Sequence, residues 1–116
     1  MLNEIYRKIQ NEKSQSINLL KDIVNIESFS GSKSNVDNLS KFLSEKCETL
    51  GGKNKFYPQK DFGDNFTSDF YSGDETILIL CHMDTVWPIG TLQERPFTIK
   101  GNIAKGPGVF DMKVGI

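Results

Sequence analysis

The stretch Ile77-Leu78-Ile79-Leu80-Cys81-His82-Met83-Asp84 decides what fold we expect of this chain. Its apolar run does not alternate with polar residues, which is typical of a strand that is buried on both faces. We therefore predict a strand over residues 76–81. A central strand of a helix-flanked sheet has this character, so the stretch favours an α/β fold over a one-sided antiparallel sheet.

Two helices are predicted upstream of this strand. Apolar side chains at spacings of three and four predict the first over residues 2 to about 25, with a frayed start or a break near Ser14. The second should begin at an N-cap on Ser34, with Asp37 as its capping-box partner, and end at Gly51-Gly52. The apolar stripe of this second helix consists of Val36, Leu39, Leu43, Cys47 and Leu50.

Short strands rich in Phe and Tyr are predicted over residues 55–58 and 65–71, with a turn at residues 61–64 between them. After Asp84 the chain should be irregular, because each proline forces the residue before it out of the helical region. We expect a short hairpin about Gly101, formed by residues 97–100 and 102–105. Trp87, Phe97 and Phe110 are expected to anchor loops or the core.

Length and composition limit the class of protein. The 116 residues suffice for one domain at most, and a content of 37% hydrophobic and 25% charged residues fits a globular chain. The net charge of −1 provides no basic field for nucleic acid, and no stretch approaches the ~20 apolar residues of a membrane span. The N-terminus lacks the apolar core of a signal peptide, so we expect a cytoplasmic protein. Cys47 and Cys81 should then be reduced, with a disulfide between them as the alternative.

Three residues carry the candidate chemistry. His82 directly follows the predicted strand, and ligands of open α/β sheets gather beyond the carboxyl ends of strands. Both His82 and Asp84 could bind one metal ion, or Asp84 could accept a hydrogen bond from the ring and fix its tautomer. The carboxylate of Asp111 could bridge two cations. Each of the three also has a purely structural alternative, and Lys113 is expected to be a solvated charge.

Separated blocks of this sequence resemble the M20 family of zinc metallopeptidases. They match in the right order, and the nearest branch is similar to the glutamate carboxypeptidases (carboxypeptidase G2-like hydrolases). The resemblance is strongest over residues 76–115. The matching blocks are His82-Met83-Asp84-Thr85-Val86-Trp87-Pro88-Ile89-Gly90-Thr91-Leu92, then Pro96-Phe97, then Gly106-Pro107-Gly108-Val109-Phe110-Asp111-Met112-Lys113.

The resemblance implies an α/β catalytic domain with a helix-flanked mixed sheet and two zinc ions per complete site, other divalent metals being possible. It implies that His82 is a zinc ligand, that Asp84 is the catalytic carboxylate that orients His82, and that Asp111 bridges both metals, often before a cis peptide bond. The implied reaction is hydrolysis of a peptide or amide bond by a metal-activated water. The substrate would be a peptide or an N-acyl amino acid, and no substrate-binding residue can be named.

The resemblance also implies that the site is incomplete within residues 1–116. The family's remaining ligands include a Glu pair and a second histidine, whereas this chain has one histidine. We therefore expect the N-terminal portion of an M20-type catalytic domain, inactive alone and without the lid or dimerisation domain that would allow a full-length homodimer. The alternatives are a non-catalytic truncated product, a half that complements a separate remainder, or a small metal-binding module. Val114 stands where the family usually has glycine, which could crowd the following helix.

Overall fold

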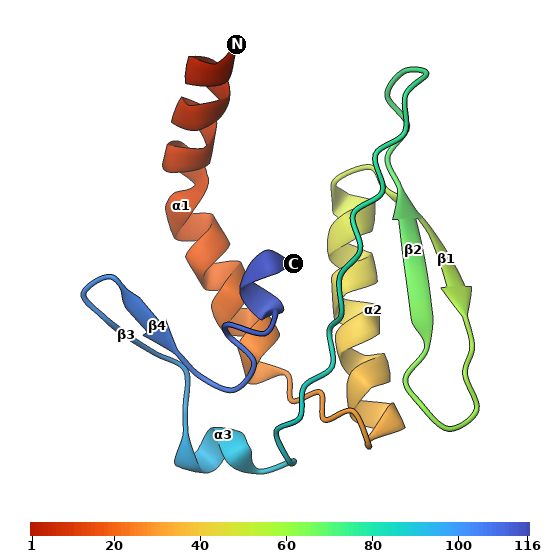
Figure 1. Ribbon diagram of the computed structural model, residues 1–116, viewed down its shortest axis with the longest axis vertical. Coiled ribbons are helices and arrows are strands. Elements are labelled where there is room, and N and C mark those ends of the chain that lie inside the picture. Colours follow the sequence, from red (N-terminus) through yellow and green to blue (C-terminus); the bar gives the residue numbers. More distant parts are fainter.

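Two long helices and two separate hairpins form most of the regular structure of the chain, which the computed structural model describes over residues 1–116 (Figure 1). Each hairpin is a two-stranded antiparallel sheet. This is a small α/β unit, compatible with part of an α/β domain. In chain order the elements are α1 (Leu2–Asn25), α2 (Lys33–Thr49), β1 (Lys53–Tyr57), β2 (Asn65–Asp69), α3 (Thr91–Glu94), β3 (Thr98–Lys100), β4 (Ile103–Lys105) and the 3-10 turn η1 (Lys113–Gly115).

Helix α1 is continuous over its 24 residues, so the predicted frayed start or break near Ser14 does not occur. Only its C-terminal part is buried: Ile23 is 2% exposed, whereas Leu2 and Ile9 are 81% and 59% exposed. Figure 1 shows the N-terminal half of α1 extending beyond the other elements. Ile23 packs with Leu39 and Leu43 of α2 to form the core, so the core lies at the C-terminal end of α1.

Helix α2 begins two residues earlier than expected and ends at the predicted glycine. Its N-cap is Ser32, and Asp37 accepts the N–H of Asp64 instead of capping, so the predicted capping box with Ser34 is wrong. The helix ends as predicted before Gly51. The φ of Gly51 is 89°, a left-handed value that glycine adopts without strain, and its N–H donates to the Glu48 carbonyl. Of the predicted apolar stripe, Val36, Leu39 and Leu43 are buried, Cys47 is half-buried and Leu50 is exposed.

Strands β1 and β2 form the first predicted hairpin, with ends shifted by up to two residues. Phe56 and Phe66 are paired across it, with ring centroids 5.6 Å apart. Its loop lies against α2, because a Cβ on Gly63 would fall only 2.1 Å from Val36 Cγ1. Glycine at this position therefore allows the hairpin to pack on the helix.

The strand predicted over residues 76–81 is wrong. The segment has no regular secondary structure and belongs to neither sheet. Its apolar side chains are exposed, from 79% at Ile79 to 87% at Ile77. Figure 1 draws it as a line without an arrow, between the turn after β2 and the loop before α3. A strand needs a hydrogen-bonded neighbour on at least one edge, and no other segment of the chain supplies one here, so the predicted mixed sheet does not form.

The C-terminal part contains the second predicted hairpin, β3 and β4, which turns at Gly101 with a φ of 59°. The peptide bond between Asp111 and Met112 is cis, as expected. Val114 in η1 is 62% exposed; the helix that it could crowd does not occur within these residues, so that expectation stays a prediction. Cys47 and Cys81 are both free thiols. None of the helices combines the length and the apolar character needed to cross a membrane.

Candidate functional site

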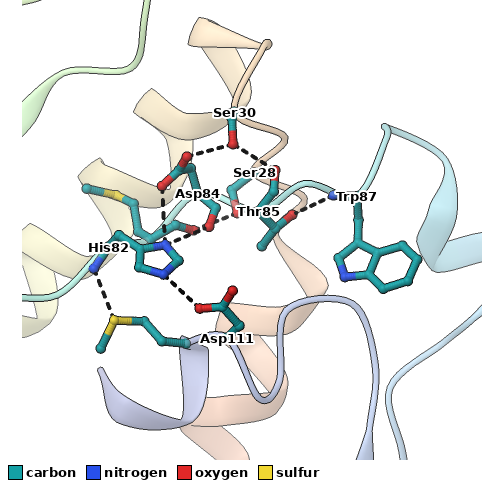
Figure 2. A network of polar contacts seen from close by, with 9 residues as sticks. Ser28, Ser30, His82, Asp84, Thr85, Trp87 and Asp111 are labelled. Carbon is teal, nitrogen blue, oxygen red and sulfur yellow. Dashed lines mark hydrogen bonds and ion pairs between the residues drawn. The ribbon is translucent and has the colours of Figure 1, made fainter.

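The structure brings the three predicted site residues together around the imidazole of His82 (Figure 2). The ring nitrogen Nε2 lies 2.9 Å from Oδ1 of Asp111. The other nitrogen, Nδ1, lies 3.1 Å from the backbone oxygen of Asp84 and 3.4 Å from its carboxylate Oδ1. The main-chain oxygen of Asp84 is therefore the nearer acceptor for a proton on Nδ1, and the carboxylate Oδ1 is the more distant of the two oxygens.

Both carboxylates act on the charge state of the ring. They raise the pKa of His82 above its ordinary 6.5, chiefly through the hydrogen bond with Asp111, with smaller contributions from Asp84, while partial burial opposes the rise. The side chains of His82, Asp84 and Asp111 are 48%, 42% and 80% exposed. A ligand in solvent can therefore reach Nε2 and the Asp111 carboxylate, in competition with protons.

The loop that follows α1 holds Asp84 in place. Phe29 and Thr85 form an isolated parallel β-bridge, in which the Thr85 N–H donates to the Ser28 carbonyl at 2.8 Å and the Ser30 N–H donates to the Thr85 carbonyl at 2.9 Å. The hydroxyl of Ser30 donates to Oδ2 of Asp84 at 2.6 Å (Figure 2). Residues 83–85 are thus fixed, although the segment before them is unpaired.

Lys113 connects the loop that carries Asp111 to the end of α1. Its Nζ donates to the backbone oxygens of Ile23 at 3.0 Å and Ile26 at 2.9 Å. Carbonyl groups at a helix C-terminus have no partner within the helix, so the ammonium group satisfies them and faces the negative end of the helix dipole. Lys113 is 3% exposed, which corrects our expectation of a solvated charge, and burial lowers its pKa to about 8.

A cleft of about 350 Å³ opens beside the three site residues. Trp87 lines it, and the guanidinium of Arg95 lies 4.5 Å from the centre of the Trp87 ring. Gly108 and Thr85 meet closely at this cleft, because a Cβ on Gly108 would fall 2.5 Å from Thr85 Cγ2. Phe110 also lines the cleft but is 92% exposed, so it does not anchor its loop as expected.

Glu27 fixes the loop that presents Trp87. Its carboxylate accepts the N–H of Gly90 at 2.8 Å and the N–H of Leu92 at 3.2 Å. These donors lie at the start of the short helix α3, where backbone N–H groups are otherwise unpaired. The short loop after α1 therefore supplies three supporting side chains: Glu27 binds the backbone before and within α3, and Ser28 and Ser30 bind residues 83–85.

The donor chemistry of His82 and Asp111 fits part of a zinc site. An imidazole nitrogen and a carboxylate oxygen are both common zinc ligands, and on a tetrahedral ion they would lie roughly 3.3 Å apart. The observed separation of Nε2 and Oδ1 is 2.9 Å. A four-coordinate site needs further donors, and no group of three or more His, Cys, Asp or Glu side chains is placed to hold a metal ion. These residues therefore supply two donors and not a complete site.

Sequence reasoning missed the residues that support the site. The sequence predicts no role for Ser28 or Ser30, and it predicts a solvated charge for Lys113. Their partners are main-chain oxygens or a carboxylate 54 to 90 positions away in the chain. No local pattern signals such contacts. The one available hint was that Ser28 and Ser30 lie two residues apart, as on one face of an extended segment.

Comparison with known proteins gives one informative relative. No protein-family model matches the chain. The chain is 30% identical over 116 residues to carboxypeptidase G2 of Pseudomonas sp. (strain RS-16), an alignment that covers 97% of this chain. The chain spans only 28% of the length of that relative. This likeness supports a carboxypeptidase G2-like relationship and a peptidase-like hydrolase, in which this chain corresponds to a part.

Proposed function

We propose that this chain is the N-terminal portion of the catalytic domain of a zinc-dependent hydrolase of the M20 type, which cleaves peptide or amide bonds in the manner of a glutamate carboxypeptidase. The observation that carries the proposal is the placement of His82 between Asp84 and Asp111 beside a cleft. The partial likeness to carboxypeptidase G2 supports the same reaction class. The site's remaining ligands and the helix-flanked mixed sheet would come from residues other than these 116.

In this proposal each residue has a defined task. The lone pair of His82 Nε2 and a carboxylate oxygen of Asp111 would hold zinc, and Asp111 would be shared between two ions. Asp84 would keep the ring proton on Nδ1, so that Nε2 is free to bind. A bound zinc ion would supply Lewis acidity, which polarises a peptide carbonyl and activates water. None of the three residues is free to act as the general base, so these residues alone should not complete a reaction.

Zinc titration of the 116-residue protein by calorimetry tests the proposal. We expect weak binding that His82→Ala abolishes and that Asp111→Asn reduces, because each removes one of two donors. Asp61→Asn, a change in the exposed turn of the first hairpin, is the matched control and should leave binding unchanged. Absence of zinc binding by the wild-type chain would contradict the assignment of a metal site.

A hydrolysis assay tests the second part of the proposal. The purified chain, supplied with zinc and with N-acylated or γ-linked glutamate substrates, should show no turnover. Metal-dependent turnover that His82→Ala removes would refute the view that the site is incomplete.

A complementing half is the second candidate function, favoured by the exposure of Ile77 and Ile79 in an extended segment without a strand partner. In that case a separate chain would provide the rest of the sheet and of the zinc site. Unlike a module that binds metal on its own, such a half would bind zinc weakly in isolation. Strong stoichiometric binding by the isolated chain would instead favour the metal-binding module.

A further inference from the structure

Two serines of the loop after α1 contact residues 83–85 in different ways. The hydroxyl of Ser28 donates to the backbone oxygen of Met83 at 2.8 Å, and Ser28 is 1% exposed. The hydroxyl of Ser30 lies 2.6 Å from Asp84 Oδ2 and 3.0 Å from the backbone oxygen of Thr85. A hydroxyl has one proton to donate, and the Thr85 oxygen already accepts the N–H of Ser30. The charged carboxylate at the shorter distance is therefore the acceptor for Ser30 Oγ.

We propose that Ser30 is a positioning residue for His82, and that it acts through the carboxylate of Asp84. The proposal deepens the function proposed above and rests on it, since it concerns how the ring offers Nε2 to a metal ion. Figure 2 shows the chain of contacts, which runs from Ser30 to Asp84, from Asp84 to His82 and from His82 to Asp111.

The need for positioning follows from the two carboxylates around one ring. A neutral imidazole carries its proton on either Nδ1 or Nε2. Asp111 accepts a proton on Nε2, which blocks the lone pair that a metal ion would use. Asp84 accepts a proton on Nδ1 at its backbone oxygen, and its carboxylate, 3.4 Å from Nδ1, adds an electrostatic attraction for that proton; the Nε2 lone pair is then free. The balance between the two tautomers therefore depends on how well Asp84 is placed.

Ser30 fixes that placement. The side chain of Asp84 is 42% exposed, so without a partner its carboxylate could rotate into solvent. With Oδ2 held by Ser30, Oδ1 stays 3.4 Å from His82 Nδ1. The backbone bonds of the same loop do not need the hydroxyl, because they run from the N–H groups of Ser30 and Thr85. Loss of the hydroxyl should thus release the carboxylate and leave the loop in place.

Nitrogen-15 NMR of the imidazole tests this inference directly, because His82 is the only histidine in the chain. The spectrum is recorded without metal, above the pH at which the same spectra show the ring to have become neutral. In the wild type we expect both tautomers to be populated, because each ring nitrogen has an acceptor. Ser30→Ala should shift the ring toward the Nε2–H tautomer and weaken zinc binding roughly tenfold, the lower end for loss of an outer partner of a metal ligand. Ser30→Thr, which keeps a hydroxyl, should restore both.

Ser28→Ala is the matched control. It removes a neighbouring hydroxyl that bonds only to main chain, so it should lower the unfolding midpoint and leave the tautomer ratio unchanged. If Ser30→Ala does not fold, Ser30→Cys tests the same point, because a thiol has nearly the same shape as a hydroxyl but is a weak donor. The tautomer ratio of His82 should then shift in the same direction. An unchanged tautomer ratio in a folded Ser30 variant overturns the inference. If the ratio shifts but wild-type chain binds no zinc, the positioning role stands and the proposed metal site fails.

Discussion

Replacing Lys113 by methionine should change how the stability of this protein depends on pH. The ammonium group of Lys113 is buried, and its pKa falls from 10.5 to about 8 because burial disfavours the charged form. The fall corresponds to roughly 3 kcal/mol, at about 1.4 kcal/mol for each tenfold change in an equilibrium constant. At a pH between these two pKa values, Lys113 is protonated in the unfolded chain and neutral in the folded chain. The free energy of unfolding should therefore rise with pH across this range.

Methionine has a similar length and does not titrate, so Lys113→Met should lack this rise. At pH 7 two effects oppose each other in the variant. The backbone oxygens of Ile23 and Ile26 lose their donor, at about 1–3 kcal/mol each, while the cost of burying a charge disappears. The absolute change at one pH is therefore not diagnostic. The free energy of unfolding of the wild type should instead increase relative to that of the variant by roughly 2 kcal/mol between about pH 7 and about pH 10.

Urea denaturation followed by circular dichroism, repeated across this pH range, measures the difference. Lys105→Met is the matched control, since Lys105 is exposed, and its profile should run parallel to that of the wild type. Parallel profiles for wild type and Lys113→Met would refute the reasoning, because they would mean that Lys113 titrates alike in the folded and unfolded chain.

Three further changes test other parts of the structure. Leu39→Ala, at a fully buried position between α1 and the first hairpin, should cost about 2–5 kcal/mol in urea denaturation, and a cost below 1 kcal/mol would contradict the proposed core. His82→Gln should remove a contribution to stability that the wild type has below pH 6.5 and loses as the pH rises through the raised pKa of His82; equal pH profiles would argue against the contacts with Asp84 and Asp111. Ile79→Lys should reduce the concentration-dependent self-association that sedimentation velocity measures, and should change the free energy of unfolding by less than about 0.5 kcal/mol. A wild type that stays monomeric at all concentrations would show that the exposed segment does not drive self-association.

Local patterns in the sequence predicted the local structure well. Apolar spacing predicted α1 and α2, and glycines at positions 51 and 101 marked a helix end and a hairpin turn. These features depend on residues within a few positions of one another, so a short window of sequence contains their cause. The capping box at Ser34 failed because the helix begins at Lys33, which places Ser34 inside it; Asp37 accepts the N–H of Asp64, far along the chain.

The predicted central strand failed for a different reason. The apolar run from Ile77 to Leu80 has the composition of a buried strand, but burial and pairing are properties of what surrounds a segment. In this chain no neighbouring strand or covering helix meets those side chains, and they are exposed. The composition of the segment therefore indicates that it suits a buried position between paired strands, and the fold of these 116 residues does not provide such a position.

The candidate site is ordered despite this, because both of its halves are fixed to the same end of α1. Ser28 and Ser30, which follow the helix directly, hold residues 83–85 through the parallel bridge and the contact with Asp84. Lys113 holds the other half by donating to the last carbonyl groups of the helix. Figure 1 shows η1 beside the C-terminal part of α1, and the two elements are in contact. The distance between His82 and Asp111 is thus set by one rigid helix end and two sets of hydrogen bonds. Loss of the backbone bridge or of the Lys113 contacts should therefore move the two donors relative to each other.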